Sequence, residues 1–131
     1  MEKIEPYFVP FGRLLLAVLF IMAGASKIAS GGAGMIEYME SAGVPGILFW
    51  PAALFELVAG LMILVGYKTK LVAFLLAGFC LLTGVLFHFI PEDQTQMTMM
   101  FKNFGMAGGF LFLARFGAGE LSMDNRASAE E

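Results

Sequence analysis

Ionisable and polar side chains stand isolated inside long apolar runs of this sequence, and they are the residues whose types could do chemistry. Glu56 lies in ALFELVAGLMILVG, His88 lies in LFHFIPED, and Lys102 and Asn103 lie in FKNFGMAGGF. Titratable groups in such surroundings are rare, usually face a bundle interior or a wet cavity, and mark ligand sites or proton paths. These four residues are therefore the candidate ligand-binding set.

The runs around these residues are long enough to be membrane spans. A helix needs about 20 mostly apolar residues to cross a bilayer. Four segments meet this condition, at residues 8–28, 47–66, 71–90 and 97–116. The sequence therefore predicts an all-α fold, a four-helix transmembrane bundle, as one domain over residues 1–131 with a flexible polar tail at 120–131.

The composition of the chain supports this class and excludes others. The 131 residues are 59% hydrophobic and only 15% charged, with a mean hydropathy of +0.79, whereas soluble domains are about 25% charged. The net charge of −3 and the lack of a basic run exclude nucleic acid as a partner. A single cysteine excludes an intramolecular disulfide, and a single histidine with few carboxylates gives no ligand set for a metal ion.

Charged residues outside the spans predict the orientation. Basic residues gather on the side of both termini and acidic residues on the other side, so the positive-inside rule predicts cytoplasmic termini in a bacterial inner membrane. The basic residues are Lys3, Lys68, Lys70, Arg115 and Arg126, and the acidic residues are Glu37, Glu40, Glu92 and Asp93. On the outer side, GAGMIEYMESAG predicts a short surface helix whose Met35, Ile36 and Met39 rest on lipid.

Glu56 needs a partner, because an isolated carboxylate is costly in hydrocarbon. The helical rise places Glu56 about 14 Å below the outer end of its span, and Arg13 and Lys102 each about 6–7 Å away in depth. Both side chains are long enough to cover that distance. We predict an ion pair with Arg13 or Lys102, a choice that the sequence leaves open. Lys27 is interpreted as an outer snorkelling anchor, so Arg13, Lys27, Glu56 and Lys102 form the expected structural polar cluster.

The site residues have more than one interpretation. His88 is either a hydrogen-bond donor or proton relay for a ligand, or an interfacial histidine bonded to Glu92 or to backbone. Lys102 and Asn103 are either an anchor for an anion or carbonyl, or a contact between helices.

The same residues carry a resemblance to the DoxX family of small four-helix bacterial membrane proteins. The matching stretches include GRLLLAVLFIMAGASKI, AGVPGILFWPAALFELVAGLMILVGYKTKLVAFLLAGF, LFHF, FKNFGMAGGFLFLA and GAGELSMD, from Phe11 to Asp124. The family pattern falls on Gly12, Arg13, Gly24, Lys27, Glu56, Gly60, Gly66, His88, Lys102 and Asn103.

The resemblance implies a link to membrane redox chemistry. The family takes its name from a subunit of an archaeal thiosulfate:quinone oxidoreductase, and other members are linked to complexes that handle thiols and oxidative stress. It implies a quinone as ligand and a membrane or thiol-redox protein as partner.

Three hypotheses follow for the function. The first is a quinone-linked subunit of a membrane redox or oxidative-stress system, although the chain has no self-contained catalytic motif. The second is a small proton-coupled transporter, which would require a homo-oligomer. The third is a non-enzymatic membrane scaffold for partner proteins.

Overall fold

The computed structural model describes residues 1–131 and consists of helices joined by short connections. The helices are α1 (Phe8–Ser30), α2 (Met35–Ser41), α3 (Phe49–Val65), α4 (Thr69–His88), α5 (Gln94–Phe116) and α6 (Met123–Glu130), with short 3-10 helices at Glu5–Tyr7 and Gly46–Leu48. The predicted all-α fold is confirmed. The short helix expected between the first two spans is α2.

Three of the four long helices have the length and composition of membrane spans. Helices α1, α3 and α4 are long and apolar enough to cross a bilayer, by length and composition alone. Helix α5 is long enough, with 23 residues, but it is less apolar, because it begins with QTQMT and contains Lys102, Asn103 and Arg115. The structure therefore directly supports three of the four membrane spans that the sequence predicts.

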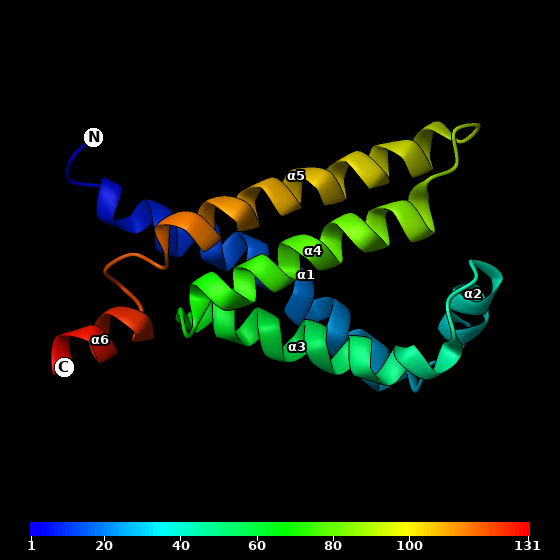
Figure 1. Ribbon diagram of the computed structural model, residues 1–131, viewed down its shortest axis with the longest axis horizontal. Coiled ribbons are helices and arrows are strands. Elements are labelled where there is room, and N and C mark those ends of the chain that lie inside the picture. The colour runs from blue at the N-terminus through cyan, green and yellow to red at the C-terminus, as the bar shows by residue number, and fades with distance from the viewer.

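The long helices form two pairs. Helix α1 packs along α3, and α4 packs along α5 (Figure 1). Both termini and α6 lie at one end of the molecule, here called the termini end, and α2 lies at the other, here called the α2 end (Figure 1). The two pairs diverge towards the α2 end.

Glycine permits the close approach of α1 and α3. A Cβ atom on Gly24 would lie 2.6 Å from the backbone nitrogen of Leu57 and 2.8 Å from the carbonyl oxygen of Ala53. A Cβ on Gly60 would meet Ile21 at 2.9 Å. Small residues at helix contacts are typical of membrane proteins, where van der Waals packing drives association.

Aromatic packing joins the two pairs. Phe20 of α1 lies edge-on to Phe110 of α5, with 5.6 Å between ring centroids, and to Phe79 of α4 at 6.3 Å. Phe20 and Phe110 belong to one buried cluster with Ile63 and Leu76. This cluster fills the interior between the pairs, away from the α2 end.

A set of contacts at the termini end, here called the terminal clamp, fixes the start of the tail. Arg13 is only 4% exposed and donates from Nη2 to the carbonyl oxygen of Leu121 at 2.7 Å. The Asp124 carboxylate accepts from the backbone N–H groups of Lys68 at 2.7 Å and Thr69 at 2.9 Å. Gly66 has φ +71° and leaves no room for a side chain beside Arg13.

Asp124 therefore supplies the N-terminal cap of α4 from 55 residues further along the chain. It satisfies N–H groups that have no partner within the helix. The tail, for which the sequence predicted flexibility, is helical from Met123 and anchored at its start.

We expect Asp124→Ala to reduce the free energy of unfolding by about 0.5–2 kcal/mol at neutral pH, the usual value of such a cap. Burial alone would raise the pKa of Asp124, but the N–H groups of Thr69 and Lys68 and the charge of Arg13 hold this pKa below its ordinary value. A carboxylate with a lowered pKa stabilises the folded state at pH values above its ordinary pKa of about 4. This stabilisation is lost as the pH falls through the lowered pKa. Thermal unfolding in detergent, measured from pH 7 downwards, should show the variant and the native chain converging in acid. Glu130→Ala, an exposed carboxylate on the same helix, is the control, and an equal effect from it would contradict this role for Asp124.

Candidate functional site

A cavity of about 380 Å³ lies between α3 and α4 at the α2 end. Its apolar lining comes mainly from these two helices and from α2, which covers it. The polar lining consists of Lys27, Tyr38, Glu56, Thr83, His88 and Asn103. A largely apolar cavity with a few convergent polar groups is the usual form of a small-molecule site, and this volume lies in the lower part of the range of about 300–1,000 Å³.

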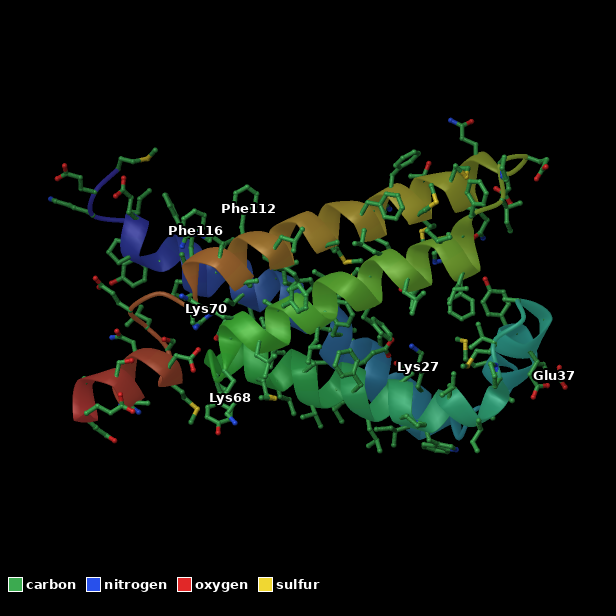
Figure 2. All side chains as sticks on the ribbon, in the orientation of Figure 1. Lys27, Glu37, Lys68, Lys70, Phe112 and Phe116 are labelled. Carbon is green, nitrogen blue, oxygen red and sulfur yellow. The ribbon has the colours of Figure 1, made fainter.

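Glu56 is neutralised by Lys27 on the wall of this cavity. Lys27 Nζ lies 2.7 Å from Oε1 and 2.6 Å from Oε2 of Glu56. The side chain of Glu56 is 6% exposed and that of Lys27 is 23% exposed. Figure 2 shows Lys27 between the two helix pairs. The pair presents a fixed, nearly neutral polar surface to the cavity.

The prediction that Glu56 has a cationic partner is confirmed, but the choice of Arg13 or Lys102 was wrong. Side chains on a helix tilt towards its N-terminus. Arg13 on α1 therefore leans to the termini end, where it contacts Leu121. Lys102 on α5 leans the opposite way, towards the α2 end. Both lean away from Glu56, which depth alone did not reveal.

The same tilt brings Lys27 and Glu56 together. Lys27 leans back along α1 towards the interior, and Glu56 leans along the antiparallel α3 towards the α2 end. Gly24, one turn before Lys27, contacts the backbone of α3 beside Ala53 and Leu57, so Lys27 lies on the α1 face that meets α3. Helix α1 continues to Ser30, and Lys27 lies in its last turn, at the end of the span where it was expected.

His88 ends α4 and is held by a residue of α5. Its Nδ1 lies 2.7 Å from Oε1 of Gln96. One interpretation of the sequence had Glu92 or backbone as the partner of this side chain, and the structure shows neither. When Nδ1 donates to this amide oxygen, the neutral ring has an unprotonated Nε2, which accepts a proton or a hydrogen bond. Nε2 has no hydrogen bond within the protein, so it remains available to a ligand.

Asn103 lines the cavity but Lys102 does not. Asn103 Nδ2 donates to Thr83 Oγ1 at 3.3 Å, and Thr83 Oγ1 donates to the carbonyl oxygen of Phe79 at 2.8 Å. Lys102 is exposed, since consecutive residues on a helix project about 100° apart. The structure thus brings together Glu56, His88 and Asn103 from the predicted set and leaves Lys102 outside.

Tyr38 is a cavity residue that sequence reasoning missed. Its ring stacks on Phe87 with 5.7 Å between centroids, and its hydroxyl donates to the carbonyl oxygen of Phe87 at 3.2 Å. These contacts hold α2 against the end of α4. Met35 and Met39, expected to rest on lipid, instead line the cavity with Tyr38. Met35, Tyr38 and Met39 are spaced i, i+3 and i+4, so they share one face of the helix. This spacing could have identified them as a group from the sequence.

The family model of DoxX matches residues 8–89. The chain belongs to the DoxX family. The matched region contains Arg13, Lys27, Glu56 and His88, whereas α5 with Asn103 and Gln96 lies beyond it.

Relatives of this DoxX protein match over nearly their whole length. The inner membrane protein YqjF of Escherichia coli K12 is 44% identical over 124 residues, which cover 95% of each chain. The inner membrane protein YphA of the same strain is 32% identical, over 93% of this chain and 91% of its own. A Haemophilus influenzae protein is 25% identical over 96% of this chain and 95% of its own. No solved structure matches. The relatives and the apolar helices support a membrane location.

Proposed function

We propose that this DoxX-family membrane protein binds a quinone-type ring compound in the cavity between α3 and α4 and serves a membrane redox system. The observation that carries the proposal is the cavity itself, an apolar space of about 380 Å³ with His88, Asn103 and the Lys27–Glu56 pair on its wall. A flat ring with two polar oxygens matches such a lining, since the apolar side chains take the ring and the polar groups take the oxygens.

His88 gives the site a role in proton transfer. With Nδ1 held by Gln96, a neutral ring accepts a hydrogen bond from a quinol hydroxyl at Nε2, and a protonated ring donates to a quinone carbonyl. Asn103, held by Thr83 of α4, adds an amide on the wall formed by α4 and α5. The chain supplies no electron carrier of its own, so its partner in the proposal is a second membrane or thiol-redox protein.

We also propose that α5 crosses the membrane with the other three long helices, which gives the four-helix bundle. Its packing along α4 supports this, because a helix that follows a membrane span over its length shares the same environment. An even number of spans puts both termini on one side, in agreement with their common end in Figure 1. The basic residues at that end favour the cytoplasmic side.

We expect His88→Ala to weaken the binding of a short-chain benzoquinone by about tenfold, the equivalent of one hydrogen bond to a partly buried group. The measurement is a titration of the purified protein in lipid nanodiscs, with co-purified quinone extracted and detected by its absorbance. Lys70→Ala, at the termini end, is the matched control and should bind as the native chain does. A native protein that carries no quinone and shows no saturable binding would rule the proposal out.

The two other hypotheses have separate tests. A proton-coupled transporter predicts proton or solute flux into vesicles that contain the purified chain. A scaffold predicts one stoichiometric partner and no small-molecule ligand, which native mass spectrometry of gently extracted protein would detect.

A further inference from the structure

Helix α5 has an outward face that no other part of the molecule covers. Phe101 is 60% exposed on this helix, Phe112 is 70% exposed and Phe116 is 71% exposed. Figure 2 shows Phe112 and Phe116 projecting from α5 on the side away from α4. Lys102 is also exposed and follows Phe101 directly. A positive charge thus stands on a surface that is rich in aromatic side chains.

The chain offers no carboxylate to this lysine. The one acidic residue inside the four long helices is Glu56, and Lys27 already holds both of its oxygens. The nearest acidic residue along the chain is Asp93, nine positions before Lys102, which the helical rise puts about 14 Å away along the axis. Charged residues in membrane helices almost always face protein or water and pair with other groups. Lys102 therefore has no carboxylate partner within the chain.

The surface beside Lys102 is open enough for another helix. A Cβ atom on Gly105 or Gly108 would have no atom of the protein within 4 Å. Glycines in such a position let two helix backbones approach closely. Helix α5 is also the long helix that is not apolar enough to be a candidate span by itself. A helix of this composition is better suited to contact with protein than with lipid on its outer side.

We propose that Lys102, Gly105 and Gly108 form the docking surface for a membrane-spanning helix of a different protein, which places an aspartate or glutamate opposite Lys102. Charge complementarity selects this occupant. A second copy of this chain docked by a two-fold axis would bring two Lys102 side chains to the same depth of one interface and offer no carboxylate to either, because such an interface uses the same surface of both subunits. The proposal is independent of what the cavity binds.

Photo-crosslinking in the inner membrane of the native host tests this surface. A benzophenone-bearing phenylalanine replaces Phe101 in one variant and Phe112 in another. The same replacement at Phe74 is the matched control, because Phe74 is an aromatic residue 62% exposed on α4. We expect the two α5 probes to capture the same membrane polypeptide, through a peptide that contains a membrane-spanning segment with an aspartate or glutamate. The Phe74 probe should not capture it.

The charge is tested in the same assay. Lys102→Leu should reduce the crosslinked product by about tenfold, the equivalent of a desolvated pair between helices. Lys102→Glu should abolish the product, and exchange of the partner's carboxylate for lysine should restore it. Lys70→Leu, which removes a charge at the termini end, should leave the yield unchanged. Lipid adducts alone, a dimer of this chain, or a product insensitive to Lys102→Leu would each overturn the proposal.

Discussion

Replacement of Lys27 by methionine is expected to lower the free energy of unfolding by about 3–5 kcal/mol, the usual cost of removing one partner of a buried ion pair. The Glu56 side chain is 6% exposed, and Lys27 is the one cation that contacts it. Without Lys27 the carboxylate has neither a counter-charge nor a hydrogen-bond donor. Unfolding of the purified protein in mixed micelles, followed by circular dichroism against denaturant concentration, measures the difference.

A double variant separates loss of the pair from loss of packing. Lys27→Met combined with Glu56→Leu removes both charges, and replacement of a whole buried pair by apolar residues is often neutral or stabilising. The double variant should therefore recover most of the lost stability. Lys70→Met, an exposed lysine at the termini end, should have little effect. If Lys27→Met were as stable as the native chain, the pair would have no structural role.

Gly24→Ala is expected to cost about 1–3 kcal/mol, the usual penalty of an added methyl group in a packed contact. The new Cβ would lie 2.6 Å from the backbone nitrogen of Leu57 and 2.8 Å from the carbonyl oxygen of Ala53. Backbone atoms cannot rotate away as a flexible side chain does, so α1 and α3 must separate. The same denaturation measurement in mixed micelles determines the change.

Gly12 provides the matched control on the same helix. A Cβ on Gly12 would have no atom within 4 Å, so Gly12→Ala should be neutral or stabilise α1 by about 0.5–1 kcal/mol through helix propensity. Opposite signs for the two alanine variants would confirm that packing against α3 explains the glycine at 24. A destabilisation shared equally by both variants would contradict this explanation.

Sequence patterns predicted the helices because the apolar runs are long and separated by glycine, proline and charge. They also identified Glu56 as a paired group, because burial of a lone carboxylate is costly wherever it occurs. The predicted positions of the helix ends were less accurate. The start of α5 at Gln94 was missed because Asp93 accepts hydrogen bonds from the backbone N–H groups of Thr95 and Gln96 and so caps polar residues that hydropathy assigns to a loop.

The side chain that pairs with Glu56 could not be read from the sequence. It depends on which helices are neighbours and on the direction in which side chains lean. Depth placed Arg13 and Lys102 near Glu56, whereas the packing of α1 on α3 selects Lys27. The role of α2 as a cover over the cavity depends on Tyr38 meeting Phe87, 49 residues away. No local pattern encodes such a contact.

The terminal clamp has a consequence for the order in which the protein is made. Arg13 lies in the first helix, yet its carbonyl acceptor at Leu121 is 108 residues later, and α4 receives its cap from Asp124. A ribosome makes Leu121 and Asp124 long after the first helix. Until then, Arg13 lacks its carbonyl acceptor and the start of α4 lacks its cap. The terminal clamp therefore closes only after the segment from Leu121 to Asp124 has been made, and a change in that segment acts on this late step.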